Sequence, residues 1–331
     1  MDRDTRSRRH FLRTAGALAA ATVAQSAAWA QSPAGSLRIL CSGPAGSIPD
    51  TVARRYAEQL SGRYPGGVLV DNRPGAAGQI AVGALKQAAP DGATLLLAQG
   101  AIATVYPYLY AKLGYDPVAD LKPVSVAAEA TLALAVGSAV PANVRTLNDF
   151  IDWSRANPTL SNFGSPGPGT LPHVLSAMLF RESKVEAQHV AYAGGPQAMV
   201  DLMGGRIASL VLPEGLLRPH QAAGKLRVLA TSGSARSAFM PDVPTFVEQG
   251  HPNLAIREWF GFFMPGTTAA TVVESASQSV RATADNKALG GALAEMGMLA
   301  NGSTPAAMSE RIATEQRYWR DAINSTGIRV E

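Results

Sequence analysis

Short apolar segments alternate along this chain with segments of helical periodicity. The apolar runs at residues 37–42 and 93–98 are typical of buried strands. Val52, Tyr56 and Leu60 follow one another at four-residue spacing, which predicts a helix that packs one face against a sheet. The same alternation recurs to the end of the chain. It predicts an α/β fold built around a largely parallel sheet.

Two apolar runs, at 132–136 and 257–263, separate two sets of these strand and helix units. We expect both runs to cross between two lobes. The first lobe then takes residues 31–136 plus 257–331, and the second takes 137–256. The predicted architecture is two-lobed, with two crossing strands as the hinge.

Residues 1–30 read as an export signal. Arg8 and Arg9 are followed by Phe11 and Leu12, which resembles the twin-arginine consensus, and an Ala-Trp-Ala cleavage pattern ends at residue 30. The weakly apolar run at 15–23 is far shorter than the roughly 20 residues that span a bilayer. An ordinary secretory signal is the alternative. Both predict a periplasmic protein, and the first adds the twin-arginine export machinery as a partner.

The amino-acid composition excludes several classes of protein and of binding surface. Hydrophobic residues make up 47% of the chain and charged residues 16%, which excludes disorder for the bulk of it. The single cysteine, Cys41, excludes a disulfide framework and is expected in the core. Beyond residue 30 the chain carries 24 basic and 23 acidic side chains, so we expect no nucleic-acid surface.

The most informative chemical feature is a repeated loop. Three predicted strands end in segments rich in Gly, Ser and Pro, at 42–50, 164–170 and 194–196, and each opens directly into a helix. Helix N-termini carry unpaired N–H donors and the positive end of the helix dipole. Loops of this kind from two lobes, facing one cleft, would bind a small anion through backbone N–H groups.

Enzymatic motifs are mostly missing. Ser165 has Phe163, not Gly, two residues before it, so it is not a nucleophile elbow. The histidines beyond residue 30 have no metal-binding spacing, so we predict no metal site, no cofactor and no catalytic residue. His173 is expected to pack or to form a local hydrogen bond. Glu214 has two readings: a carboxylate at the rim of the cleft that favours a ligand ammonium or hydroxyl, or a solvated loop residue.

Nearly the whole chain beyond the signal resembles the Bug (TctC-like) family, the periplasmic receptors of tripartite tricarboxylate transporters. The matching segments are 44–54 (PAGSIPDTVAR), 71–78 (DNRPGAAG), 89–95 (APDGATL), 115–124 (YDPVADLKPV), 162–170 (NFGSPGPGT), 192–195 (YAGG) and 241–250 (PDVPTFVEQG).

The resemblance implies a two-lobed periplasmic binding protein of type II that closes on a small carboxylate. In this family the ligand is held mainly by backbone N–H groups and ordered waters, and membrane permease subunits receive it. The expected ligand-binding residues are Ser42, Pro44, Ala45, Gly46, Ser47, Thr104, Ser165, Gly167, Gly169, Thr170, Tyr192, Ala193, Gly194 and Glu214.

Two segments depart from the family pattern. The first loop has Ala45 where Gly is usual, with one extra residue before Asp50, and Ala193 replaces a frequent Lys. Both changes affect the choice of ligand rather than the fold.

Two functions follow from the sequence. The leading hypothesis is a receptor without enzymatic activity that captures a dicarboxylate, tricarboxylate, aromatic acid or acidic amino acid. The alternative is an enzyme or a sensor on the same scaffold, in which Ser165, His173 and Glu214 converge. A cleft lined by N–H groups, without a hydrogen-bonded Ser–His pair, would favour the receptor.

Overall fold

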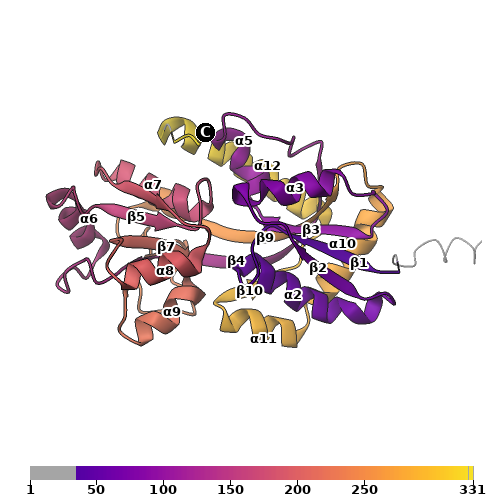
Figure 1. Ribbon diagram of the computed structural model, residues 1–331, viewed down its shortest axis with the longest axis horizontal. Coiled ribbons are helices and arrows are strands. Elements are labelled where there is room, and N and C mark those ends of the chain that lie inside the picture. The colour runs from indigo at the N-terminus through magenta and orange to yellow at the C-terminus, as the bar shows by residue number, and fades with distance from the viewer. Residues whose placement is uncertain (1–34, 327, 331) are drawn as a thin grey trace, which may run out of the picture.

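The computed structural model describes residues 35–326 and 328–330. The predicted export signal lies outside these residues. In the described part, one ten-stranded sheet runs through two lobes in the order β2-β1-β3-β9-β4-β7-β5-β6, with β10 and β8 also paired to β4. Figure 1 shows the two lobes side by side, with β4 and β9 passing between them.

The first lobe is built on strands near both ends of the chain. Its strands are β1 (Leu37–Cys41), β2 (Val68–Asn72), β3 (Thr94–Gln99), β9 (Arg257–Pro265), β10 (Met298–Ala300) and the first part of β4 (Leu121–Val136). Its helices are α2 (Ile48–Leu60), η1 (Ser61–Arg63), η2 (Ala76–Gly78), α3 (Gln79–Lys86), α4 (Ala101–Thr104), α5 (Tyr106–Leu109), α10 (Ala270–Ala284), α11 (Lys287–Glu295) and α12 (Pro305–Thr326).

The second lobe is formed by the middle of the chain. Its strands are β5 (Asn162–Ser165), β6 (Gln188–Ala191), β7 (Ser209–Pro213), β8 (Arg227–Thr231) and the end of β4. Its helices are α6 (Leu147–Ala156), α7 (Leu171–Glu182), α8 (Gly195–Met203), α9 (Glu214–Ala222) and η3 (Pro252–Leu254). α6 begins with a capping box: the Asp149 N–H donates to the Thr146 side chain, and the Thr146 N–H donates to the Asp149 carboxylate.

Strand direction places the loops of interest at the boundary between the lobes. β1 pairs in parallel with β2 and β3, and β5 pairs in parallel with β6 and β7. The carboxyl ends of each set face the other lobe, which is where open α/β sheets bind ligands. The sheet is therefore parallel in each lobe, as predicted, and antiparallel at the crossing strands.

β4 is shared by both lobes. Its residues 121–131 pair with β9, and its residues 132–136 pair with β7 and β8. This agrees with two crossing strands at the hinge, whereas the limits of the lobes at residues 136 and 257 stay predictions.

The lobes also touch beside the hinge. Arg218 Nη2 in α9 donates to the Glu295 carbonyl oxygen at 3.0 Å. Gly215 packs so closely on Met296 that a Cβ there would overlap the Met296 carbonyl oxygen. Only glycine permits this approach of α9 to the end of α11.

The last described residues attach to the end of α5. Val330 forms a parallel bridge with Tyr110: its N–H donates to the Leu109 carbonyl at 3.0 Å, and its own carbonyl accepts from the Ala111 N–H at 3.3 Å. The C-terminal segment therefore fixes the backbone on which Tyr110 stands.

Candidate ligand-binding site

The loop between β1 and α2 places the first group of predicted residues. Ser42 is buried and donates from Oγ to Gln99 Oε1 at 2.9 Å, whereas Pro44, Ala45 and Gly46 are exposed. Among the described residues, the N–H groups of Gly43 and Ala45 have no hydrogen-bond partner. They are free to donate to a ligand.

Asp50 stabilises this loop from inside the first turn of α2. Its carboxylate accepts from the Gly46 N–H at 2.8 Å, from Arg54 Nε at 3.1 Å and from Asn72 Nδ2 at 2.8 Å. Burial raises the pKa of Asp50, but these hydrogen bonds outweigh it, so the pKa lies below its ordinary value. The Gly46 N–H, expected to bind the ligand, is thus already paired with Asp50.

The loop between β5 and α7 is closed on itself by two histidines. Ser165 Oγ lies 2.7 Å from His189 Nε2, and the Gly167 N–H donates to Ser165 Oγ at 3.3 Å. The Gly169 N–H donates to His173 Nδ1 at 3.1 Å. The predicted hydrogen-bonding role of His173 is confirmed, and the N–H groups of Gly167 and Gly169 are occupied within the loop.

The structure thus contains a hydrogen-bonded Ser–His pair, the feature whose absence was expected to favour the receptor, but the pair is a structural element of the loop. His189 stacks on His173 with 4.0 Å between ring centroids, and both rings stack on Phe163. Burial, together with the neighbouring His189 charge, lowers the pKa of His173 to about 4, and burial lowers that of His189. Ser165 is fully buried, and no described carboxylate bonds to His189. The pair therefore lacks an accessible nucleophile and an orienting acid.

The alternative hypothesis, in which Ser165, His173 and Glu214 converge, was wrong for Glu214: Ser165 and His173 share a cluster through His189, and Glu214 forms no contact with it. Ser165 pairs with His189, and Glu214 bonds to Ser237 at 2.6 Å. Glu214 is only 1% exposed, so the solvated reading was wrong as well. Its second oxygen has no hydrogen-bond partner in the described part of the chain, and burial raises its pKa.

The third loop, after β6, lies against the second. The Tyr192 N–H donates to the Ser165 carbonyl at 3.0 Å, and the Tyr192 hydroxyl bonds to Asp201 at 2.9 Å. Ala193 is exposed and Gly194 partly so, and neither N–H has a hydrogen-bond partner among the residues described. This loop supplies the free donors that the second loop lacks.

Tyr110 connects the two lobes at these loops. Its hydroxyl donates to the Pro168 carbonyl at 3.1 Å. Gly169 has a φ of +80°, and a Cβ there would overlap the Tyr110 hydroxyl. On the first-lobe side, Tyr106 stacks edge-on against Tyr110, and Gln99 Nε2 lies 3.1 Å from the Tyr106 hydroxyl. A chain of contacts therefore runs from Ser42 through Gln99 to the second lobe.

A cavity of about 220 Å³ lies at the same boundary. Thr104, expected in a loop, lies in the short helix α4 and lines this cavity, while its hydroxyl donates to the Gly100 carbonyl at 3.2 Å. The lining residues are Gln99, Gly100, Ala101, Thr104, Val105, Leu171, Ala255, Ile256, Arg257, Glu258, Trp259, Arg311, Thr314, Glu315, Tyr318 and Trp319.

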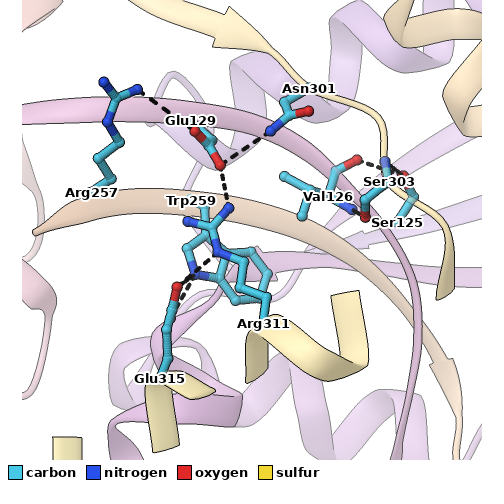
Figure 2. A network of polar contacts seen from close by, with 9 residues as sticks. All are labelled: Ser125, Val126, Glu129, Arg257, Trp259, Asn301, Ser303, Arg311 and Glu315. Atoms are coloured by element: carbon cyan, nitrogen blue, oxygen red, sulfur yellow. Dashed lines mark hydrogen bonds and ion pairs between the residues drawn. The ribbon is translucent and has the colours of Figure 1, made fainter. Parts of the chain in front are cut away.

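The charged residues beside this cavity form a network on α12 and the crossing strands. Arg311 pairs with Glu129 on β4 and, at 2.8 Å, with Glu315. Its guanidinium lies 5.0 Å from the Trp259 ring centroid, and Trp259 Nε1 donates to Glu315 at 2.9 Å. Figure 2 shows Arg311 between the two carboxylates, with Trp259 beside it.

Sequence reasoning missed Gln99, Tyr106, Tyr110, Glu258 and Arg311. Gln99 ends a strand that leads into the cleft, so its position was an available signal. Arg311 and Glu315 have helical four-residue spacing, but nothing in the spacing shows that their partner is a strand far away in sequence.

No group of three or more His, Cys, Asp or Glu side chains in the described residues is arranged to hold a metal ion. No helix in that part of the chain is both long and apolar enough to cross a membrane.

Comparison with known proteins gives a consistent answer. Residues 52–328 match the profile of the tripartite tricarboxylate transporter family receptor. A UPF0065 protein of Bordetella bronchiseptica is 31% identical over 274 residues, which cover 83% of this chain and 79% of that protein.

Solved structures agree with these matches. Rpa4515 of R. palustris, solved with adipate, superposes with a TM-score of 0.82 at 27% identity, over 88% of this chain and 97% of that one. MatC of Rhodopseudomonas palustris, with bound malate, gives a TM-score of 0.79 at 25% identity, over 87% and 98%. The chain therefore belongs to the TctC or Bug family of tripartite tricarboxylate transporter receptors, which bind solutes and are not enzymes.

Proposed function

We propose that this receptor captures a small organic carboxylate in the periplasm and delivers it to the membrane subunits of a tripartite transporter. The observation that carries this proposal is the set of free backbone N–H groups on loops of both lobes: Gly43 and Ala45 in the first lobe, Ala193 and Gly194 in the second. Relatives solved with adipate and with malate support a carboxylate as the ligand.

The electrostatics favour an anion at these loops. α2, α7 and α8 each begin at a predicted loop, so the positive ends of three helix dipoles lie on the two sides of the boundary. Donors that are already held in place lose little entropy when the ligand binds. A carboxylate bound by the first and third loops would contact both lobes and stabilise the closed arrangement.

The remaining predicted residues would shape the site rather than donate to the ligand. Three backbone N–H groups already have acceptors within the protein: Gly46 donates to Asp50, Gly167 to Ser165 and Gly169 to His173. These hydrogen bonds hold the loops in one conformation without ligand. The hydroxyls of Ser47 and Thr170 already donate to the Pro44 carbonyl at 2.6 Å and the Gly167 carbonyl at 2.8 Å. These two residues and Pro44 would therefore contact the ligand mainly through carbon. Export by the twin-arginine route would bring the folded receptor to the periplasm.

The first test is a ligand screen. Thermal-shift measurements and calorimetry on the purified protein should identify at least one binder among monocarboxylates, dicarboxylates, tricarboxylates and acidic amino acids. A ligand at 100 times its Kd adds about 2.7 kcal/mol to the apparent stability. If none of these acids raises the melting temperature, the proposed function is wrong.

A glycine variant tests the closed arrangement. Gly169→Ala should weaken binding of the identified ligand at least tenfold, because the added methyl group meets the Tyr110 hydroxyl. Gly224→Ala is the matched control, since Gly224 also has a positive φ, +68°, but has open space around it. Equal affinities for the two variants would show that the contact of Gly169 with Tyr110 is irrelevant to binding.

A further inference from the structure

Glu258 is the one residue of the β9 segment whose environment the receptor fold leaves unexplained. It lies on a crossing strand, opposite Ala130 of β4, and it lines the cavity between the lobes. The residue is 8% exposed, and its carboxyl group has no hydrogen bond or ion pair with any described residue. Its oxygens are not among the fully buried polar atoms, so water or a ligand in the cavity can reach them. A largely buried carboxyl without a protein partner is unfavourable unless such a molecule solvates it.

The neighbouring charges do not compensate it. Glu258 lines the same cavity as Trp259, Arg311 and Glu315, but no hydrogen bond or ion pair joins it to any described residue. The Arg311 guanidinium also lines the cavity, but it is already paired with the carboxylates of Glu129 and Glu315. Burial alone raises the pKa of Glu258 to about 7, with no cation that counteracts it.

The position of Glu258 connects it with the proposed site. The next residue but one along β9, Phe260, pairs with Gln99, whose side chain bonds to Ser42 in the first loop. Burial is the main cause that raises the pKa of the Tyr106 phenol, and the charge of Glu258 makes a smaller contribution in the same direction. Tyr106 and Gln99 are hydrogen-bonded to each other, so Glu258 lies next to the chain of contacts that joins the lobes.

We infer that Glu258 is a specificity-determining residue that accepts a hydrogen bond from a donor group, an ammonium or a hydroxyl, on the bound carboxylate. This inference rests on the proposed function. The backbone N–H groups of the loops would hold the ligand carboxylate, and the ligand would supply the partner that Glu258 lacks. A plain dicarboxylate would leave Glu258 unpaired or bring a second negative charge toward it.

Glu214 differs from Glu258 in its hydrogen bonding and in its position relative to the cavity. Glu214 is also buried with one free oxygen, but its other oxygen bonds to Ser237 and it does not line the cavity. Glu214→Gln is therefore the matched variant for Glu258→Gln, and it also tests the reading of Glu214 as an ammonium or hydroxyl partner.

The experiment uses calorimetry with two series of acids that differ only in the donor. The first is succinate, malate and aspartate, and the second is adipate and 2-aminoadipate. The wild-type protein should bind a donor-bearing acid about 10–100-fold more tightly than the plain acid of the same length. Glu258→Gln should remove most of that difference where the donor is an ammonium, and should change the affinity for the plain acid less than threefold. Glu214→Gln should change all the affinities by a similar, small factor.

A second variant separates the two donors. If the ligand donor is an ammonium, Glu258→Gln and Glu258→Met both lose the preference, because both remove the charge. If it is a hydroxyl, the Gln amide oxygen still accepts and only Glu258→Met loses the preference. Either pattern supports the inference.

Three results would overturn it. Plain acids could bind the wild-type protein as tightly as their donor-bearing analogues, Glu258→Gln could weaken both kinds by the same factor, or Glu214→Gln alone could abolish the preference. A wild-type protein without the preference overturns the inference even if no variant folds, and a preference is assigned to Glu258 only through its variants. If the wild-type protein binds no carboxylate at all, the proposed function itself fails, and the role of Glu258 fails with it.

Discussion

Glu129 and Glu258 occupy neighbouring positions on the two crossing strands but have opposite surroundings. Glu129 lies opposite Trp259. Its carboxylate forms ion pairs with Arg311 and, at 3.8 Å, with Arg257, and it accepts a hydrogen bond from Asn301 at 3.2 Å. Glu258 lies one position along and has no partner among the described residues. Figure 2 shows how fully Glu129 is surrounded.

The contrast separates a structural charge from a functional one. Both carboxylates are largely removed from water, so burial alone does not distinguish them. On the side of α12, cations and an indole N–H compensate the negative charges and join the helix to the hinge. In the same cavity the protein leaves the Glu258 carboxyl unpaired, so a bound proton, water or a ligand has to compensate its charge.

The largest effect is expected from Arg311→Met. Removing the guanidinium leaves Glu129 and Glu315 without their shared partner, which should lower the free energy of unfolding by about 3–5 kcal/mol. Urea denaturation followed by circular dichroism measures it. Arg55→Met is the control, because the ion pair of Arg55 with Glu58 is exposed and contributes about 0.5 kcal/mol or less. Equal losses in both variants would show that the α12 network is no more important than a surface pair.

The next effect concerns the dependence of stability on pH. The pKa of Glu258 is raised from 4.5 to about 7 by folding, so the folded chain holds this proton more tightly. Below pH 4.5 both states are protonated and the residue has no destabilising effect. As the pH rises toward 7, the unfolded chain ionises first and the free energy of unfolding falls by roughly 3 kcal/mol, then levels off.

Comparison of wild-type protein with Glu258→Gln isolates this contribution. The variant should be more stable than the wild type above pH 7, and the difference should vanish near pH 4. A difference that stays constant across this range would mean that Glu258 has an unshifted pKa, which contradicts an unpaired buried carboxyl.

The smallest effect is expected from Tyr110→Phe. The variant loses only the hydrogen bond from the Tyr110 hydroxyl to the Pro168 carbonyl, about 1 kcal/mol, or roughly fivefold in ligand affinity. Stability without ligand should change little, because Tyr110 is partly exposed and its ring packing remains. Calorimetry with the ligand from the screen measures the affinity. An unchanged affinity would show that the contact between the lobes makes no contribution to binding.

Local signals in the sequence predicted much of the fold. The apolar runs at 37–42, 93–98, 132–136 and 257–263 became β1, β3, the end of β4 and β9. These features depend on residues a few positions apart, so periodicity is enough to find them. The family segments added the two-lobed architecture.

The site was only partly predictable, because its contacts join residues far apart in the chain. The loops were located correctly, but nothing in the sequence indicates that Asp50 and His173 occupy the N–H groups of Gly46 and Gly169. In the sequence, Glu258 looks like an ordinary charged residue at the start of an apolar strand. That its carboxyl group has no hydrogen-bond partner can be seen only in the folded structure, where all the surrounding elements are placed.

The bridge between Val330 and Tyr110 has a practical consequence for anyone who produces this protein. A purification tag or fluorescent fusion joined directly after residue 331 would disturb the bridge between Val330 and Tyr110, and through Tyr110 the contact with Pro168. A label introduced at an exposed surface position of α10, such as Glu274, would leave that bridge intact.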